Sequence, residues 1–317
     1  MGRAVCLSFL AAILLAGCAT GVPVPVADLP APAAPALKTA PRLGLALGGG
    51  AARGFAHVGV IKVLESHGIV PDIVVGTSAG SVVGALYAAG YGSLDLQRIA
   101  LQLGEASLWD WSLPDRGVIR GESLQNFINR AVQNRPIEKL NKVFAAVATD
   151  LQKGDAVTFG QGNTGMAVRA SSSIPGVFQP VTLNGRDYVD GGLVSPIPVR
   201  AARQLGAEVV IAVDISSRPE NGEIKGSFDV LRQTLAIMAR VLGGQELQEA
   251  DVVIRPNTAE LKSTSFDTRH LAILEGERAA QAALPAIREK LAAFVGVQRG
   301  EKPREDKLSA APSGGRR

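Results

Sequence analysis

Cysteine and histidine are scarce in this chain, and their positions exclude several kinds of chemistry. Only Cys6 and Cys18 occur among 317 residues, both near the N-terminus. The residues that follow them therefore form no disulfide, carry no thiol nucleophile and supply no cysteine ligand to a metal ion. The three histidines are His57, His67 and His270, and no two are spaced as a metal-binding pair. We expect no metal and no cofactor.

Aromatic residues, basic clusters and long apolar runs are also few. Aromatic residues make up 4% of the chain and hydrophobic residues 46%, so the core must be aliphatic. The net charge is +4, but no run of Lys and Arg is long enough for a nucleic-acid footprint, and we expect no nucleic-acid partner. Beyond residues 4–16, no apolar segment reaches membrane-spanning length without a charge or a glycine.

The apolar stretch 4–16 is too short for an ordinary transmembrane helix and suits the core of a signal peptide. It ends in Leu15-Ala16-Gly17-Cys18, which resembles a bacterial lipobox. This resemblance implies cleavage before Cys18, lipidation of Cys18 and anchoring in a membrane; the alternative is an uncleaved apolar N-terminus. Gram-negative lipoproteins kept in the inner membrane carry Asp at the next position. Ala19 therefore favours the outer membrane, on its periplasmic or surface face.

Composition divides the chain into four parts. Residues 1–17 form the expected lipoprotein signal peptide, and residues 18–41, rich in Pro and Ala, a semi-extended tether. Residues 42–298 hold the expected folded domain. The charged segment 299–317 is typical of a disordered tail.

Within 42–298, apolar runs alternate with helical patterns. The expected strands are 43–47, 73–75, 144–149, 208–213 and 252–254, with shorter ones at 156–159 and 188–189. The expected helices are 53–67, 79–89, 93–103, 122–133, 166–172, 198–205, 230–249 and 270–294. This alternation predicts an α/β fold, a three-layer α/β/α sandwich with a mainly parallel central sheet. In helix 230–249, Leu231, Leu235, Met238 and Leu242 recur at helical spacing, and we expect them to face the core.

A nucleophile pattern follows the second expected strand. The motif Gly76-Thr77-Ser78-Ala79-Gly80 lies between an apolar run and a helix. A G-x-S-x-G elbow in this context holds a serine hydroxyl above the edge of the sheet. Gly76 and Gly80 fit a tight turn and close packing of helix on strand. Ser78 is the candidate nucleophile.

A glycine-rich loop, 48–54, follows the first expected strand. It reads Gly48-Gly49-Gly50-Ala51-Ala52-Arg53-Gly54. Its amides suit an anion, so it is an oxyanion hole, a nucleotide-phosphate site or merely a tight turn. The Lys and Ser/Thr of a phosphate-binding loop are missing, and no ribose-binding acid ends the second strand. The oxyanion hypothesis is therefore favoured.

A serine nucleophile needs a base. His270 lies late in the chain, as in a Ser-Asp-His triad, but it begins an ordinary amphipathic helix. Carboxylates are the alternative, and Asp150, Asp190 and Asp214 each end an expected strand. Only Asp190 is followed by two glycines, Gly191 and Gly192, which permit close approach of another loop or form a simple turn.

The chain resembles the patatin-like phospholipase family in three motifs and in their order. These are the glycine loop with Arg53, the GTSAG motif and Asp190-Gly191-Gly192. The branch resembled is that of bacterial proteins related to the catalytic domain of neuropathy target esterase. Further matching blocks are ARGFAHVGVIKVLE (52–65), VATDL (147–151), AVRASSSIPGVFQPV (167–181) and YVDGGLVSPIPV (188–199). Together they cover about residues 42–290.

The resemblance implies a dyad without histidine. Ser78 would attack the carbonyl carbon of a phospholipid or lysophospholipid ester, Asp190 would take its proton, and amides among Gly48, Gly49, Gly50, Ala51 and Arg53 would hold the oxyanion. Arg53 would brace the loop or steer a phosphate. The glycine spacing departs from the usual family loop by one residue, which leaves open which amides act. Alternatives are a general carboxylesterase or thioesterase, and a non-catalytic lipid-binding lipoprotein. The oligomeric state is not predicted.

Overall fold

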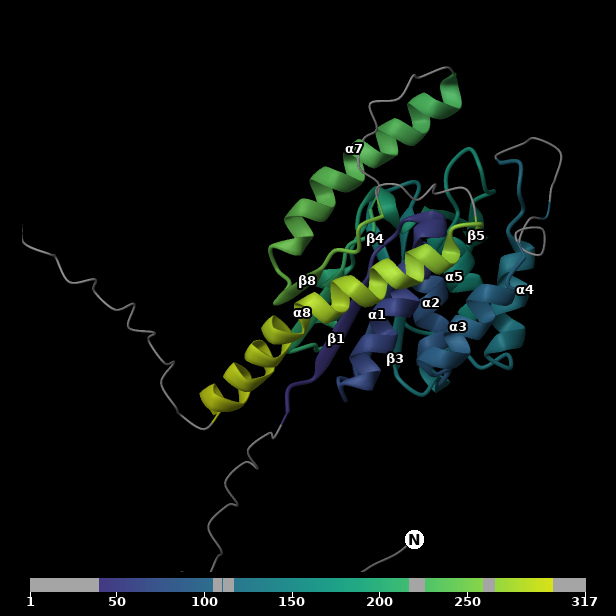
Figure 1. Ribbon diagram of the computed structural model, residues 1–317. Coiled ribbons are helices and arrows are strands. Elements are labelled where there is room, and N and C mark those ends of the chain that lie inside the picture. Colours follow the sequence, from purple (N-terminus) through teal and green to yellow (C-terminus); the bar gives the residue numbers. More distant parts are fainter. Residues whose placement is uncertain (1–39, 105–109, 111–116, 217–225, 259–265, 299–317) are drawn as a thin grey trace, which may run out of the picture. The chain divides into compact units, whose positions relative to one another are not determined.

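Figure 1 shows the computed structural model, which describes residues 40–104, 110, 117–216, 226–258 and 266–298. The expected signal peptide, the lipidation site Cys18, nearly all of the tether and the tail 299–317 lie outside the described residues. Among the helices that are described, none is both long and apolar enough to cross a membrane.

The described residues build an 8-stranded sheet in the order β5-β6-β3-β2-β1-β7-β8, with β4 paired to β3. The strands are β1 Leu43–Leu47, β2 Ile73–Thr77, β3 Val143–Asp150, β4 Ala156–Phe159, β5 Val181–Leu183, β6 Arg186–Asp190, β7 Val209–Val213 and β8 Val252–Ile254. Neighbours among β1, β2, β3, β7 and β8 pair in parallel, whereas the pairs made by β4, β5 and β6 are antiparallel. The expected mainly parallel α/β sheet is confirmed.

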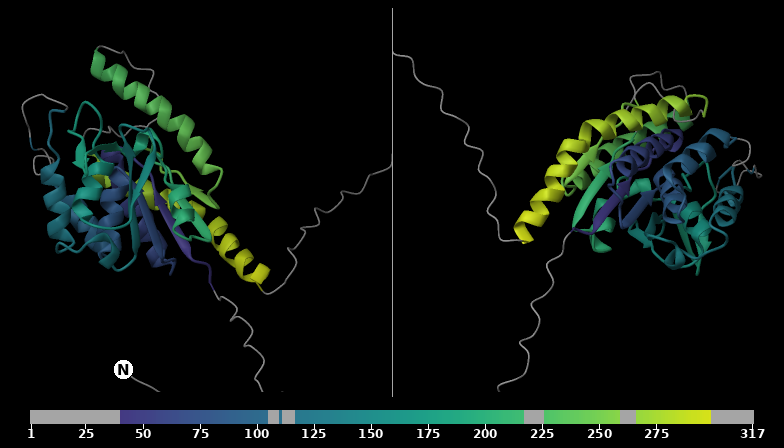
Figure 2. Two further views of the ribbon diagram at one scale, coloured as in Figure 1. Left: turned by 180° about the vertical axis from the view of Figure 1, so that it is seen from behind. Right: turned by 60° about the horizontal axis from the view of Figure 1, so that its bottom comes forward.

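Helices cover both faces of this sheet. The α-helices are α1 Phe55–Ser66, α2 Ala79–Ala88, α3 Ser93–Gln102, α4 Glu122–Ala131, α5 Thr164–Ser171, α6 Val199–Gln204, α7 Ser227–Leu247 and α8 Arg269–Gln298. Short 3-10 turns lie at η1 Ala51–Gly54, η3 Ile137–Lys139 and η4 Gly191–Leu193. Figures 1 and 2 show α1 and α8 side by side against one face of the sheet.

Side chains of the central strands alternate between two apolar layers. Leu45 and Val74 pack in the cluster that contains α1, α2 and α8, whereas Ala46 and Val75 point to the other face, in the cluster that contains α6. Every residue of β1, β2 and β7 is buried. This double burial explains why these strands are continuous apolar runs without a polar alternation.

The hairpin β5–β6 was only half predicted. Its second strand, β6, contains the apolar pair expected at 188–189. The sequence did not indicate β5, because this strand has only three residues and includes exposed Thr182. Asn184 and Gly185 both have positive φ, 52° and 75°. Adjacent residues with positive φ form the two-residue turn that Asn-Gly favours, so the sequence did contain a hairpin signal.

The expectation for the long helix was wrong. In α7, Met238 is 38% exposed, and Leu231, Leu235 and Leu242 are only half-buried. Leu231 and Leu235 line a cavity instead of the core. The apolar spacing is therefore real, but of the four residues Leu231 and Leu235 face a cavity, and Met238 and Leu242 line neither that cavity nor the core.

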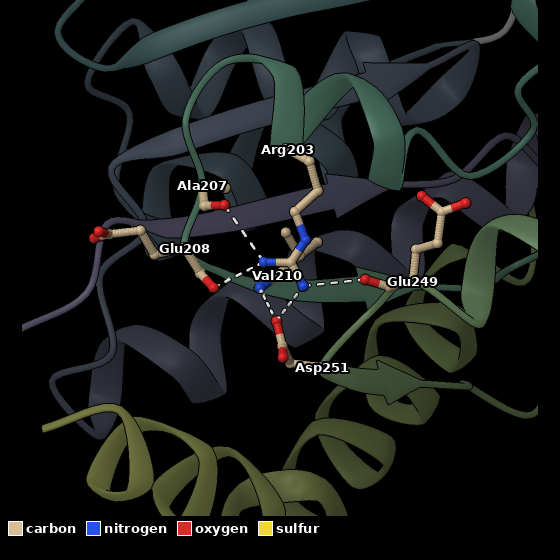
Figure 3. Close-up of polar contacts among 6 residues, drawn as sticks. All are labelled: Arg203, Ala207, Glu208, Val210, Glu249 and Asp251. Carbon is tan, nitrogen blue, oxygen red and sulfur yellow. Dashed lines mark hydrogen bonds and ion pairs between the residues drawn. The ribbon is translucent and has the colours of Figure 1, made fainter. Parts of the chain in front are cut away.

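The C-terminal end of α7 is tied to the sheet by Arg203 (Figure 3). Its guanidinium donates to the carbonyl oxygens of Glu208 at 2.8 Å and Glu249 at 3.0 Å, and pairs with the Asp251 carboxylate at 2.6 Å. Asp251 also accepts from the amide of Val210 in β7, at 2.8 Å. Arg203 thus links the beginnings of β7 and β8, at the amino ends of these parallel strands.

Candidate active site

The segments that follow β1, β2 and β7 meet at the carboxyl ends of these strands, the usual site in an open α/β sheet. Asp190 reaches the same place from the opposite direction, because β6 is antiparallel to β3. Asp190 lies opposite Ala148 on β3, one residue beyond the Val147–Thr77 pair that precedes Ser78. The structure therefore brings Asp190 to the level of Ser78 through an antiparallel strand, which the sequence did not indicate.

Ser78 occupies a strained turn between β2 and α2. Its φ of 53° and ψ of −124° are unusual for any residue with a side chain. The Ser78 carbonyl accepts hydrogen bonds from the amide of Ser81 at 2.8 Å and from the Ser81 hydroxyl at 2.7 Å, and these bonds stabilise the turn. Ser78 is 7% exposed and lines the cavity. This is the backbone arrangement of a nucleophile elbow.

Close packing requires the two glycines of the elbow. A Cβ on Gly80 would lie 2.1 Å from the carbonyl oxygen of Leu47, and one on Gly76 would lie 2.4 Å from the Gly80 backbone. The left-handed φ of the turn belongs to Ser78 itself and not to either glycine. The expected turn is therefore present, with its unusual backbone angles at Ser78, and the expected close approach of helix and strand is confirmed.

Asp190 is buried beside Ser78. Its carboxylate accepts a hydrogen bond from the amide of Gly192 at 2.7 Å, and the Ser78 hydroxyl lies close enough to stabilise its ionised form. Burial raises the pKa of Asp190 to about 6, and the Ser78 hydroxyl and the Gly192 amide oppose that rise. A carboxylate with such a pKa is ionised at neutral pH and is a stronger base than a free aspartate.

Gly191 permits a close contact between the acid turn and the nucleophile strand. A Cβ there would lie 2.2 Å from the carbonyl oxygen of Val147 and 3.1 Å from Cγ2 of Thr77. Gly192 supplies its amide to Asp190. The two glycines of the predicted acid turn therefore have separate local functions.

Two serines at the C-terminal end of α5 support this pair, and the sequence assigned them no role. Ser171 Oγ accepts from the Ser78 amide at 2.9 Å and donates to the Val147 carbonyl at 2.6 Å. The Ser173 carbonyl accepts from the Asp190 amide at 2.9 Å. The run of serines in ASSSIPG was visible in the sequence, but a serine run alone does not reveal which backbone groups it will meet.

The glycine loop lies against Ser78, and the structure reduces its set of possible oxyanion donors. A Cβ on Gly49 would lie 3.3 Å from that of Ser78. The Gly48 amide donates to Val213, the Gly49 amide to Pro196 and the Arg53 amide to Gly50, all to carbonyl oxygens at 3.0–3.1 Å. The sequence left open which amides of this loop hold an oxyanion, and the existing acceptors disfavour the amides of Gly48, Gly49 and Arg53.

The amides of Gly50 and Ala51 remain as donors. Both residues line the cavity, and no acceptor among the described residues bonds to either amide. Gly50 fits tightly, since a Cβ there would lie 2.6 Å from the carbonyl oxygen of Ile215. The Arg53 side chain is 4% exposed, which agrees with bracing of the loop and leaves little surface for a phosphate.

His57 supports the glycine loop from α1. Its Nε2 lies 2.8 Å from the Gly48 carbonyl, so Nε2 carries the proton and donates. Burial lowers the pKa of His57 to about 4, opposed by the bond to Gly48, and the ring is therefore neutral at physiological pH.

His270 is exposed at the start of α8 and does not line the cavity, so the triad alternative finds no support.

The other two strand-ending carboxylates are occupied elsewhere. Asp150 pairs with Arg186 at 2.6 Å, and Asp214 accepts from the Ser216 hydroxyl at 2.6 Å. Within the described ranges, no group of three or more His, Cys, Asp and Glu side chains could hold a metal ion.

A cavity of about 400 Å³ opens at Ser78. Most of its wall is apolar, with Ser78, Ser172, Asp190 and Ser216 as its polar side chains among the described residues. One side of the wall comes from α7, through Leu231, Leu235, Ala236 and Ala239. Such a cavity accommodates an aliphatic chain whose one polar end reaches Ser78.

A model of the patatin-like phospholipase family matches residues 45–203. An uncharacterised NTE family protein of Mycobacterium tuberculosis is 38% identical over 197 residues, which cover 59% of this chain and 53% of that protein. The lysophospholipase NTE1 of Coccidioides immitis is 37% identical over 185 residues, which cover 56% of this chain and 12% of that protein. This chain therefore spans about half the length of the mycobacterial relative.

Among solved structures, VipD of Legionella pneumophila has a similar fold. The TM-score is 0.56 at 14% sequence identity, and the match covers 78% of this chain and 67% of VipD. At this identity the likeness concerns the fold alone.

Proposed function

The chain belongs to the patatin-like phospholipase family, and from that premise we propose that it is a serine acyl hydrolase acting on fatty-acyl esters of phospholipids or lysophospholipids. Ser78 is the nucleophile and Asp190 the base. The observation that carries this proposal is the position of the Ser78 hydroxyl beside the buried Asp190 carboxylate, where both residues line an apolar cavity. The name of the fungal relative, a lysophospholipase, favours the same substrate class.

The first half of the reaction forms an acyl-enzyme. Ser78 Oγ attacks the ester carbonyl carbon, and its proton passes to Asp190. The negative charge that develops on the carbonyl oxygen is stabilised by the amides of Gly50 and Ala51. The bond from carbon to the alkoxy oxygen then breaks, and the departing alcohol takes the proton from Asp190. The fatty-acyl group remains on Ser78, with its chain along the α7 wall.

The second half releases the fatty acid. A water molecule attacks the acyl carbon while Asp190 takes one of its protons. The same two amides stabilise the second oxyanion. The bond to Ser78 Oγ breaks and Ser78 recovers its proton from Asp190, so the dyad returns to its starting state. One base therefore serves both halves without a histidine.

Fatty-acid release by the purified full-length chain tests this proposal. Substrates are a phospholipid, a lysophospholipid, an acyl thioester and a short p-nitrophenyl ester, and variants are Ser78→Ala, Asp190→Asn and His270→Ala. We expect Asp190→Asn to lose activity by roughly 10²–10⁴-fold, the usual contribution of a general base, and Ser78→Ala to lose at least as much, whereas His270→Ala keeps its activity. Equal activity in Ser78→Ala would contradict the mechanism.

The substrate series separates the alternatives. Turnover of the thioester or short ester with no release from either lipid would favour a general carboxylesterase or thioesterase. Lipid binding without hydrolysis of any ester would favour a non-catalytic lipid-binding lipoprotein.

Membrane anchoring through Cys18 is a second part of the proposal. Its support is the apolar stretch 4–16 with the lipobox-like ending, and Ala19 favours the outer membrane. Metabolic labelling with palmitate and membrane fractionation test it. We expect label and membrane association in the wild type and neither in Cys18→Ser; label retained in Cys18→Ser would contradict it.

A further inference from the structure

One short segment, 195–197, touches three parts of the proposed active site. The Ser195 carbonyl accepts from the hydroxyl of Thr77, the residue before the nucleophile, at 2.8 Å. The Pro196 carbonyl accepts from the amide of Gly49 in the glycine loop, at 3.0 Å. The Ser195 amide donates to Gly191, next to Asp190, at 2.8 Å. A displacement of this segment would therefore disturb the nucleophile, the oxyanion loop and the acid turn together.

Glu246 holds this segment from the last turns of α7. Its Oε1 accepts from the Ser195 hydroxyl at 2.7 Å, and its Oε2 accepts from the Ile197 amide at 3.1 Å. One turn earlier, Gly243 lets the helix approach, because a Cβ there would already lie 3.3 Å from Cδ1 of Ile197. Glu246 does not line the cavity and so has no direct access to substrate.

Stability alone does not explain a carboxylate at this position. Glu246 is 3% exposed, and burial raises its pKa to about 7, opposed by the bonds from Ser195 and Ile197. A buried charged group usually contributes less to stability than an apolar side chain of similar volume. What the carboxylate offers is two acceptors in one plane, matched to a hydroxyl and an amide on the same segment.

We propose that Glu246 is a positioning residue for the hydrolysis proposed above, on which this inference rests. It fixes segment 195–197, keeps the Gly49 amide bonded to Pro196 and thereby orients the amides of Gly50 and Ala51 toward the oxyanion. Through Ser195 and Thr77 it also keeps Ser78 in its strained turn. Glu246 thus acts on catalysis through backbone contacts, without touching the substrate.

The test compares two Glu246 variants of the full-length chain on p-nitrophenyl acetate. The acetyl group is too short to need contact with the α7 residues that line the cavity. A change in kcat on this substrate therefore reports on the catalytic groups. Glu246→Met keeps the volume and removes both acceptors. We expect kcat to fall roughly tenfold or more, since small misplacements of catalytic groups reduce rates by such factors, while KM stays within about twofold.

Glu246→Gln provides the conservative rescue. Its amide oxygen accepts from Ile197 and its amide nitrogen donates to the Ser195 hydroxyl, so the segment stays in place without the charge. We expect its kcat to remain within about threefold of the wild type. A Met variant that is folded and keeps wild-type kcat overturns the proposal, as does a Gln variant as slow as the Met variant.

Arg203→Gln is the matched control for a merely structural effect. Arg203 anchors the chain just after α7, but its bonds go to Ala207, Glu208, Glu249 and Asp251 and none to segment 195–197 (Figure 3). We expect Arg203→Gln to lower the Tm and to leave kcat unchanged at temperatures below thermal unfolding. If kcat falls in Arg203→Gln as much as in Glu246→Met, general loosening of α7 explains both and the proposal is overturned.

Two further measurements keep the inference testable. If Glu246→Met does not fold, Ser195→Ala is measured in its place, because it removes only the bond from the Ser195 hydroxyl to Glu246. We expect a smaller fall in kcat than for the loss of both bonds. An unchanged kcat overturns the proposal. If the wild type hydrolyses no ester, the proposed function fails but the positioning role is still measurable by amide hydrogen exchange. We then expect faster exchange in peptides containing Gly49 and Ile197 in Glu246→Met than in Glu246→Gln, and equal exchange overturns the inference.

Discussion

The Ser78 hydroxyl lies beside the Asp190 carboxylate and favours its ionised form, although the strands that carry the two residues, β2 and β6, are not neighbours in the sheet. Strand β3 lies between β2 and β6 and extends past the end of β2. Asp190 pairs with Ala148 on that extension, and Gly191 removes the side chain that would separate the acid turn from Thr77. The distance between the two groups is therefore determined by sheet register and by one close glycine contact.

The first prediction concerns the pH dependence of hydrolysis. Asp190 accepts a proton only when it is ionised, and burial raises its pKa to about 6. We expect kcat/KM to be constant above this pKa and to fall about tenfold per pH unit below it. Measurement of kcat/KM for a short ester from acid to neutral pH tests this. His270→Ala should give the same profile, and a shift of its midpoint would indicate a histidine in the mechanism.

The second prediction is that Asp190→Asn is inactive yet more stable than the wild type at alkaline pH. The pKa of Asp190 is higher in the folded chain than in the unfolded one, where it is near the ordinary aspartate value of 3.8. Folding therefore loses stability as the pH rises from about 4 through 6, because the ionised form is buried at a cost. Asparagine removes that loss and can still accept from the Gly192 amide.

Urea unfolding at acid and alkaline pH measures this effect. One pKa unit corresponds to about 1.4 kcal/mol, so the gain above pH 7 is on the order of 2–3 kcal/mol and should disappear near pH 4. Ser78→Ala is the matched control, since it is inactive but leaves the carboxylate in place. An Asn variant less stable than the wild type at alkaline pH would show that the Asp190 carboxylate is stabilised and not strained by its site.

The third prediction separates two adjacent serines. Ser171 bonds to the Ser78 amide and the Val147 carbonyl, so Ser171→Ala removes both hydrogen bonds in a buried region. We expect a loss of roughly 1–3 kcal/mol in the free energy of unfolding and a reduced kcat. Ser172→Ala is the control, because Ser172 Oγ is buried with no hydrogen-bond partner among the described residues.

Denaturant unfolding and ester kinetics on both variants decide this. We expect Ser172→Ala to stay within about 0.5 kcal/mol of the wild type, because no bond is lost. Equal losses in the two variants would mean that the bonds of Ser171 do not hold the elbow.

The fourth prediction concerns the elbow glycines. In Gly80→Ala the new methyl group would meet the Leu47 carbonyl oxygen at 2.1 Å, which requires α2 to move away from β1. We expect destabilisation of about 3 kcal/mol or more, and loss of activity. Gly160→Ala, where nothing lies within 4 Å of the added carbon, should be nearly neutral. Thermal unfolding of both variants is the measurement, and a stable, active Gly80→Ala would contradict the packing argument.

The sequence predicted the strands and helices around the site because the central strands are buried on both faces and therefore are continuous apolar runs. It also indicated the region of Ser78, since the turn follows a strand and precedes a helix. It did not indicate that β6 runs antiparallel, because direction depends on pairing with β3 and leaves no local pattern. Nor did it reveal Ser171 and Glu246, whose roles depend on backbone groups distant in the chain.

Helix α7 shows another limit of pattern reasoning. An apolar stripe at helical spacing predicts an apolar partner surface but does not distinguish a packed core from a cavity. Leu235 faces the cavity and is only half-buried, which its spacing alone does not show. In the glycine loop, similarly, the sequence indicated amides suited to an anion. Which amides remain available depends on the carbonyl oxygens of Val213 and Pro196.

The last prediction uses α7 to test whether the cavity binds the acyl chain. Ala239 lines the cavity, and Ala239→Phe would fill part of its volume of about 400 Å³. We expect kcat/KM for a long-chain lysophospholipid to fall roughly tenfold or more, since a few methylene groups no longer fit, with little change for p-nitrophenyl acetate. The matched control is Ile237→Phe, because Ile237 lies on the same helix but is 49% exposed and does not line the cavity. Parallel losses on the long and the short substrate in Ala239→Phe would mean that the chain binds elsewhere and that the helix affects only the catalytic groups.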